Sequence, residues 1–171
     1  MGELASAARA NGITDMVVVH EHRGVPDAMV VSHFPHGPTV LFTLHNVTLR
    51  HEVASHSSST VSEQYPHLIF DGFGGRLGSR VRDVLRFLFP VPKDDAKRVM
   101  TFANRNDFIS FRHHVFVATH RDVHLAEVGP RFELRPYEIR LGTLEQNEAD
   151  VEWVLRPYMN TARKRNQLAG V

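Results

Sequence analysis

The segment from His67 to Pro90 constrains the fold more than any other part of the sequence. A short apolar run over residues 67–71 predicts a strand, and a cluster of glycines then predicts a tight turn. The stretch 76–89 has apolar residues at helical spacing, and Pro90 predicts the end of this helix. A strand that is followed at once by an amphipathic helix is a unit of α/β architecture.

The other segments favour an α/β fold with mixed sheets, in which strands predominate after Pro90. Residues 1–10 are expected to form a helix that stops at Asn11-Gly12, and the β-branched run 14–22 is expected to form a buried strand. Pro136 interrupts an alternating stretch, which indicates a bulge or an edge strand. Further strands are expected at 28–33, 39–44, 99–103, 108–117, 131–141 and 151–155.

The composition excludes several classes of protein. The chain has no cysteine, so disulfides, cysteine-ligated zinc sites and thiol catalysis are ruled out. No apolar run approaches the ~18–20 residues that span a bilayer, and we expect no membrane partner. With 171 residues, of which 42% are hydrophobic, the chain is long enough to bury the core of one domain.

The basic residues are unevenly distributed along the chain. Up to Gly75 there are three basic and seven acidic residues, a net charge of −4. From Arg76 onward there are seventeen basic and twelve acidic residues, a net charge of +5. Seventeen of the twenty basic residues are arginine, whose planar guanidinium suits phosphate groups. A general bias toward arginine explains that ratio equally well, but a basic region is also typical of a polyanion site.

Two interpretations of the glycine loop remain open. The loop does not match the dinucleotide fingerprint, because Leu77 stands where the third glycine belongs, and it lacks the lysine of a P-loop. Helix N-terminal amides followed by Arg76 and Arg80 are a general arrangement for binding phosphate. The alternative is a plain tight turn with solvated arginines. The basic run Arg163-Lys164-Arg165 is open to the same two interpretations.

No pattern in the sequence supports catalysis. The string from His51 to His56 resembles a zinc-protease motif but has one residue too many, so its two imidazoles would point apart on a helix. His20 and His22 would share one face of a strand, but no third metal ligand can be identified. No serine occupies a nucleophile elbow. We therefore expect no enzymatic activity, no metal site and no cofactor.

Several strings occur in the order and at the spacing of one family. The strongest is Glu127-Val128-Gly129-Pro130-Arg131-Phe132-Glu133-Leu134. The others are VVHEHRG at 18–24, VSHFPHGPT at 31–39, the run from 76 to 95, and ISFRHH at 109–114. Together they resemble the Brix-domain family of ribosome-assembly proteins, from about Ala8 to Arg165. Gly129, Pro130 and Arg131 correspond to the signature of that family.

The resemblance implies a fold of two α/β halves, each similar to an anticodon-binding domain. The first half would be incomplete and would cover residues 1–48, followed by a connecting loop over 49–66. The second half would cover 67–158, and a basic tail would cover 159–171. The family domain begins with further segments that have no counterpart here. We therefore expect residues 1–171 to form a single, partial Brix domain that holds about the last two-thirds of the full one.

The resemblance also implies a function. The strings at 92–95 and 160–165 are similar to Imp-type members, which belong to the U3 small nucleolar ribonucleoprotein of the small-subunit processome in the nucleolus. Such members bind RNA and support the pairing of U3 small nucleolar RNA with pre-ribosomal RNA, and thus early processing of the 18S precursor. The implied partners are U3 RNA, pre-rRNA, a sister Imp subunit and a phosphoprotein scaffold.

The expected RNA-binding residues lie in the basic part of the chain: Arg76, Arg80, Arg131, Arg140, Arg163, Lys164 and Arg165. One competing hypothesis is a protein-interaction scaffold with little direct RNA binding, in which an edge near Pro136 and the serine-rich stretch 54–60 dock a partner. Another is a metal-dependent hydrolase that uses His20 and His22.

Overall fold

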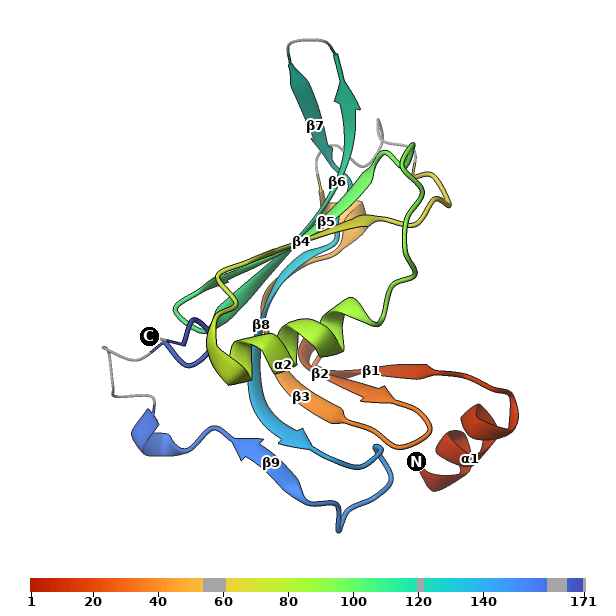
Figure 1. Cartoon of the computed structure of the whole chain (residues 1–171), viewed down its shortest axis with the longest axis vertical. Coiled ribbons are helices and arrows are strands. Elements are labelled where there is room, and N and C mark those ends of the chain that lie inside the picture. Colours follow the sequence, from red (N-terminus) through yellow and green to blue (C-terminus); the bar gives the residue numbers. More distant parts are fainter. Residues whose placement is uncertain (54–60, 120–121, 160–165, 171) are drawn as a thin grey trace. The chain divides into compact units, whose positions relative to one another are not determined.

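The computed structural model describes residues 1–53, 61–119, 122–159 and 166–170. Within these ranges the chain has two α-helices, nine strands and two short 3₁₀ helices (Figure 1), Arg50–Glu52 and Pro157–Met159. It forms two compact units. The first unit consists of Met1–Leu44 and Arg135–Asn166, and the second of His45–Leu134 and Gln167–Gly170. Strands β3 (Thr39–Thr48) and β8 (Arg131–Arg140) contribute residues to both units.

The first unit is built on an antiparallel meander. Strand β1 (Asp15–His22) pairs with β2 (Val25–His33), and β2 pairs with β3. Arg23 and Gly24 connect β1 to β2 with φ angles of 53° and 80°, as the tightest hairpin turns require. The second part of β8 pairs with the short strand β9 (Val151–Val154), which closes this unit.

Helix α1 (Gly2–Ala10) packs through small residues. Ala5 and Ala8 are buried one turn apart and contact the buried ring of Phe34, with Met16 beside them. Methyl groups let the helix approach the aromatic ring closely. The Arg9 guanidinium lies 5.3 Å from the centroid of the same ring, and it also forms an ion pair with Glu145. The N-terminal helix is therefore fixed by both apolar and charged contacts within its unit.

A buried polar group also joins distant segments of the first unit. Thr39 is 1% exposed, and its Oγ1 donates to the Gly142 carbonyl over 2.8 Å. Ser32 Oγ lies 2.9 Å from Thr39 Oγ1 and accepts from the Leu144 N–H over 3.1 Å. Because Thr39 already donates to Gly142, the proton between the two hydroxyls belongs to Ser32. These hydrogen bonds tie the β2–β3 hairpin to the loop before β9.

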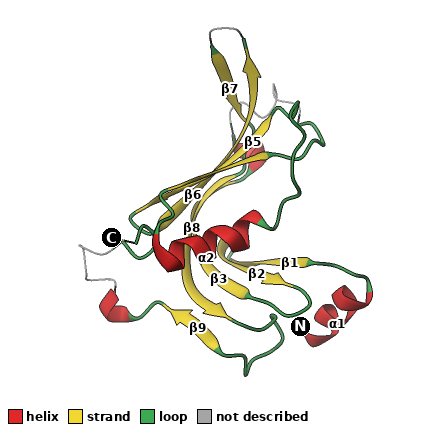
Figure 2. Ribbon diagram, viewed as in Figure 1, coloured by secondary structure: helices red, strands yellow, loops and turns green. Residues whose placement is uncertain are grey.

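The second unit contains one helix and a sheet in which four strands lie in line and a fifth pairs at one side. Strand β4 (His67–Asp71) is parallel to β5 (Arg98–Arg105), and helix α2 (Gly75–Arg86) forms the crossover between them (Figure 2). A parallel pair needs a connection of this kind. Strand β6 (Phe108–Ala118) follows, and the order is β4-β5-β6-β8. Strand β7 (Val123–Glu127) pairs with the second half of β6.

Four phenylalanines form a row straight across this sheet. The pairing register aligns Phe70 of β4 with Phe102 of β5, Phe102 with Phe111 of β6, and Phe111 with Phe132 of β8. Neighbouring ring centroids are 5.0, 5.1 and 4.6 Å apart. Such pairs contribute about 0.5–1.5 kcal/mol each beyond the area that they bury. The row therefore fixes the register of four strands.

Helix α2 covers the sheet face that carries this row. Its buried residues are Gly78, Val81, Val84 and Leu85, and Phe89 just beyond the helix reaches the Phe102 ring at 6.4 Å between centroids. The sequence pattern predicted a helix to residue 89, but α2 ends at Arg86. Residues 87–89 form a turn after the helix, and Phe89 contacts the sheet from this turn.

Most of the expected elements are confirmed, with shifted ends. The N-terminal helix and the expected strands all occur. Two expectations were wrong. Strand β1 is not buried, because it lies at the edge of its sheet and Val19 is 56% exposed. Pro136 does not mark an edge or a bulge: β8 lies between β3 and β6, and its register shift falls between Ile139 and Arg140.

The position of Pro136 has a physical reason. Strand β8 pairs with β6 as far as Leu134 and with β9 from Glu138 onward. Pro136 lies between these two pairings, so its missing N–H removes no hydrogen bond from the ladder with β6 or from the ladder with β9. The serine-rich stretch 54–60 lies outside the described residues. None of the described helices is long and apolar enough to cross a membrane.

Candidate nucleic-acid interface

Helix α2 carries four of the arginines of the basic region. At about 100° per residue, Arg76 and Arg80 lie on one flank of its buried apolar face, and Arg82 and Arg86 lie on the other flank. Arg76 is exposed, and it has no ion-pair partner among the residues that the structure describes. Arg80 is half-buried one turn later. The helix thus presents two separate pairs of guanidinium groups.

The glycines before and within α2 make room for the end of the chain. A Cβ atom at Gly74 would lie 2.2 Å from the Ala169 carbonyl oxygen, and one at Gly78 would lie 2.0 Å from that of Leu168. The Gly74 N–H donates to the Leu168 oxygen over 3.0 Å. One amide of the glycine loop, that of the N-cap residue Gly74, is therefore bound to the chain itself. This packing favours the tight-turn interpretation of the glycine loop.

Asp107 holds the same C-terminal segment from the other side. Its carboxylate accepts the backbone N–H groups of Gln167 and Leu168 over 3.0 and 2.8 Å. Asp107 lies in the β5–β6 turn with a φ of 66°, next to Asn106 with a φ of 54°. The Leu168 side chain is completely buried. The segment Gln167–Gly170 is thus an integral part of the second unit.

The Gly129-Pro130-Arg131 string forms the turn that leads into β8. Gly129 has a φ of 67°, and a Cβ atom there would lie 2.8 Å from Val53 Cγ2. Its carbonyl oxygen lies 3.0 Å from Nδ1 of the buried His113. Arg131 is exposed and contacts Glu127 Oε2 at 3.2 Å and Thr48 Oγ1 at 3.4 Å. The glycine and proline therefore shape a packed turn, and only the arginine of the string faces solvent.

The buried His113 is neutral and has one tautomer in this arrangement. Since Nδ1 faces a carbonyl oxygen, it carries the proton, and Nε2 accepts from Arg98 Nε over 3.3 Å. Burial lowers the pKa of His113, and the cations Arg98 and Arg50 lower it further. Arg98 also donates to the carbonyl oxygens of Ser62 and Gln64. The sequence showed this histidine but not its partners, which lie 15 and 16 residues away.

The remaining expected RNA-binding residues lie elsewhere. Arg140 is half-buried in the first unit, and its guanidinium is paired with Glu138. Because this carboxylate already offsets its charge, Arg140 is a weaker phosphate ligand than Arg76. Arg163, Lys164 and Arg165 lie outside the described residues. Among the members of the expected set that the structure describes, only Arg76 and Arg80 come together, on one helix.

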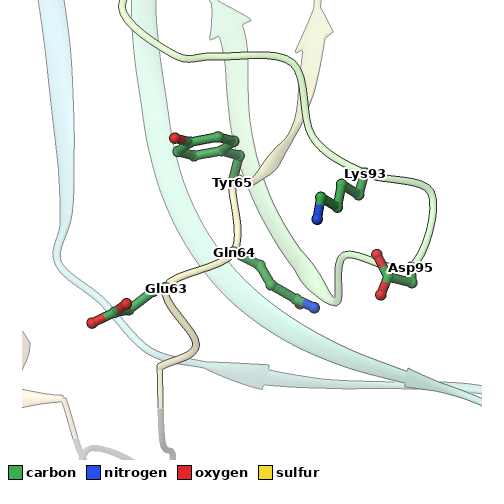
Figure 3. Close-up of a pocket in the computed structure, with 5 residues that line it drawn as sticks. All are labelled: Glu63, Gln64, Tyr65, Lys93 and Asp95. Atoms are coloured by element: carbon green, nitrogen blue, oxygen red, sulfur yellow. The ribbon is translucent and has the colours of Figure 1, made fainter.

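A pocket of about 260 Å³ lies in the second unit, between the segment before β4 and the loop after α2 (Figure 3). Its lining residues are Glu63, Gln64, Tyr65, Lys93 and Asp95. Two carboxylates against one ammonium group give the lining a net negative charge. Such a pocket does not favour a phosphate group.

The described residues do not gather into a metal site: no three histidine or acidic side chains come together among them. His20 Nδ1 instead lies 2.6 Å from Asp27 Oδ1, across the β1–β2 hairpin. This contact lowers the pKa of Asp27.

Comparison with known proteins agrees with the expected family. The model of the Brix domain matches residues 2–138. The U3 small nucleolar ribonucleoprotein protein IMP4 of Homo sapiens is 62% identical over 167 residues, which cover 96% of this chain and 57% of that protein. The protein of that name from Saccharomyces cerevisiae is 55% identical over 169 residues, which cover 98% of this chain and 58% of that protein. The chain thus spans less than two-thirds of these relatives.

A solved structure confirms the fold. The crystal structure of a probable ribosomal biogenesis protein from Aeropyrum pernix K1 matches with a TM-score of 0.51 and 20% sequence identity. The match covers 78% of this chain and 73% of that one. With a family model that extends over most of its residues, this chain belongs to the Brix-domain family.

Proposed function

We propose that this chain is the RNA-binding part of a ribosome-biogenesis factor of the U3 small nucleolar ribonucleoprotein. In this role it acts in the nucleolus, within the small-subunit processome, and supports pairing of U3 RNA with pre-ribosomal RNA and early processing of the 18S precursor. Its proposed protein partners are a sister Imp subunit and a phosphoprotein scaffold. The proposal includes no catalytic role.

The identity to the relatives carries this proposal. Proteins named as U3 small nucleolar ribonucleoprotein components in Homo sapiens and Saccharomyces cerevisiae are 62% and 55% identical to nearly the whole chain. The two relatives come from an animal and a yeast, and both match this chain closely. Residues that this chain shares with both are therefore expected to support a role common to them.

The arrangement of α2 supports direct RNA contact. Arg76 and Arg80 lie one turn apart on the flank of a helix whose apolar face is anchored on the sheet. A rigid helix holds two guanidinium groups at fixed spacing, and phosphate contacts of this kind contribute a large share of the affinity for nucleic acids. Arg131 is a separate candidate for an RNA contact, although its guanidinium forms an ion pair with Glu127.

The test is fluorescence anisotropy with labelled U3 5′-domain RNA over a series of salt concentrations, beside an unrelated RNA of equal length. The proposal predicts binding that weakens as salt rises and that prefers the U3 RNA. Equal, weak binding to both RNAs would contradict RNA recognition by this part of the protein.

A protein-interaction role is the second candidate, and one feature favours it. The β6–β7 ribbon exposes Val117, Val123 and Leu125, each by about 60% (58%, 63% and 62%). Isolated two-stranded ribbons are marginally stable, and exposed apolar side chains are typical of protein contacts. Capture of partner proteins that persists after nuclease treatment, and that is lost in Val117→Ser with Leu125→Ser, would favour this candidate.

A further inference from the structure

We propose that the outer edge of β4, with the pocket beside it, is a docking site for an extended acidic segment of a partner protein. The site lies wholly in the second unit and uses neither Arg76 nor Arg80. It therefore stands independently of the RNA-binding proposal.

The outer edge of β4 is open to strand addition. Strand β4 ends the strand order and pairs with β5 alone among the described strands. Residues His67–Asp71 include no proline and no lysine, and their register against β5 has no shift. Proline, lysine and bulges are the features with which proteins block such edges. Their absence leaves the backbone groups of β4 accessible to the backbone of another chain.

A pocket of about 500 Å³ adjoins this edge. Leu68 and Phe70 of β4 form one side of it, while Ile69 between them belongs to the opposite face and is 50% exposed. A strand added to β4 would therefore direct every second side chain into the pocket. The other lining residues come from α2 and the loop that follows it: Arg82, Arg86, Phe89, Pro90, Val91 and Pro92, with His67 at the start of β4.

The phenylalanine row ends at this pocket. Phe70 stacks on Phe102 with an angle of 6° between the ring planes, and Phe73 of the following loop contacts Phe70 edge-to-face at 5.7 Å. No described strand continues the row past β4. A partner side chain that pairs opposite Phe70 would extend the row by one position. An apolar or aromatic side chain is therefore expected at that position of the partner strand.

Charge selects an acidic partner. The Arg82 side chain is 38% exposed and forms an ion pair with Asp83 at 3.2 Å. Arg86 is exposed and has no ion-pair or hydrogen-bond partner among the described residues. One carboxylate against two guanidinium groups leaves this side of α2 positive. Glutamate or aspartate in the partner strand, two positions to either side of the apolar residues, would point toward these arginines.

A peptide fits these features better than an RNA strand. The backbone donors and acceptors of β4 have the spacing of a strand, and main-chain pairing with such an edge supplies affinity in β-augmentation. The wall formed by Phe89, Pro90 and Pro92 is apolar and offers no hydrogen-bond donor to a phosphate or a base edge. The site therefore combines strand pairing with a pocket that has an apolar wall and two arginines in its lining.

The experiment uses a labelled seven-residue peptide, ETVTFTE, which presents glutamate, valine, phenylalanine and glutamate on one face of a strand. Its control is KTVTFTK, with the charges reversed, and a single-stranded octauridylate is the RNA competitor. Binding to the full chain is followed by fluorescence anisotropy, and the site is located by amide hydrogen exchange of β4. The variant is Arg82→Gln with Arg86→Gln, and Arg156→Gln, an exposed arginine of the first unit, is its matched control.

We expect ETVTFTE to bind, to slow amide exchange in β4, and to bind about tenfold more weakly to the double variant, because its charge-assisted hydrogen bonds no longer form. KTVTFTK should not bind, Arg156→Gln should have no effect, and octauridylate should not compete. Equal binding of both peptides, or protection elsewhere than in β4, would overturn the proposal. So would octauridylate that displaces the peptide and itself loses affinity in the double variant, since the pocket would then be a nucleotide site.

Discussion

His113 holds both ends of the turn at Gly129: its Nδ1 donates to the Gly129 carbonyl over 3.0 Å, and its own backbone carbonyl accepts from Val128 over 2.9 Å. A single residue of β6 thus anchors the turn that Gly129 and Pro130 form before β8. The neutral imidazole makes one further contact, because only an unprotonated Nε2 can accept from Arg98.

This arrangement predicts a loss of stability in acid. Burial, Arg98, His114 and Arg50 lower the pKa of His113 in the folded chain, so the unfolded chain binds this proton more readily. The stabilisation is fully present above the ordinary histidine pKa of 6.5 and is lost as the pH falls through the lowered pKa. Urea unfolding at several pH values measures it, and His113→Asn should show a weaker dependence on pH. An identical dependence in the variant would assign the effect to other histidines.

Gly129→Ala is expected to destabilise the second unit by about 1–3 kcal/mol through its left-handed backbone alone. The methyl group would also lie 2.8 Å from Val53 Cγ2. Adding Val53→Ala should relieve the contact but not the backbone strain, so it should restore only part of the stability. Thermal unfolding measures both variants. If the double variant recovers fully, the φ of 67° is not the cause.

Thr39→Val keeps the shape of a buried side chain but removes its hydroxyl. The Gly142 carbonyl and the Ser32 hydroxyl would lose their partner, and we expect a loss of about 1–3 kcal/mol in the free energy of unfolding. Because Ser32→Ala removes part of the same group, the two losses should not add. Thr101→Val, a half-buried threonine of β5, is the control and should have little effect. Additive losses in the double variant would show that the two hydroxyls act independently.

Gly78→Ala tests the close packing between α2 and the end of the chain. Alanine normally favours a helix interior by about 1 kcal/mol. Here the new methyl group would lie 2.0 Å from the Leu168 carbonyl oxygen, so we expect lower stability and faster exchange of the Gln167 and Leu168 amides. Gly2→Ala in α1, which has open space around it, should be neutral or stabilising. A more stable Gly78→Ala chain with both amides still protected would refute the close approach.

The sequence pattern predicted where each helix and strand lies along the chain better than which strands pair with one another. Apolar runs and glycines located α2 and the strands, because these signals depend on a few adjacent residues. The pattern could not show that β1 lies at an edge, or that Pro136 falls between two pairings of β8. Strand β7 was missed because its side chains are mostly exposed and give no buried periodicity.

The candidate sites show the same limit. Arg76 and Arg80 could be named from their spacing on one helix. The pocket beside Arg82 and Arg86 could not, because Phe70 and Phe89 reach it only through the register of β4 and the turn after α2. The buried partners of His113 likewise depend on tertiary structure. Residues on one element can thus be predicted from spacing, whereas sites that several elements share cannot.

The RNA-binding proposal makes its sharpest prediction for the two flanks of α2. Arg76→Ala with Arg80→Ala should weaken binding of U3 RNA. It should also make the slope of log affinity against log salt shallower, by about 0.7 for each phosphate that the protein no longer neutralises. Arg82→Ala with Arg86→Ala makes the same change of charge on the same helix, on the opposite flank, and is the matched control. If Arg76 and Arg80 bind phosphates, the first variant shows lower affinity and a shallower slope, and the second keeps both. Equal effects of the two variants would show that α2 acts only through its net charge. If the first variant binds RNA as the unchanged chain does, Arg76 and Arg80 are not part of the interface.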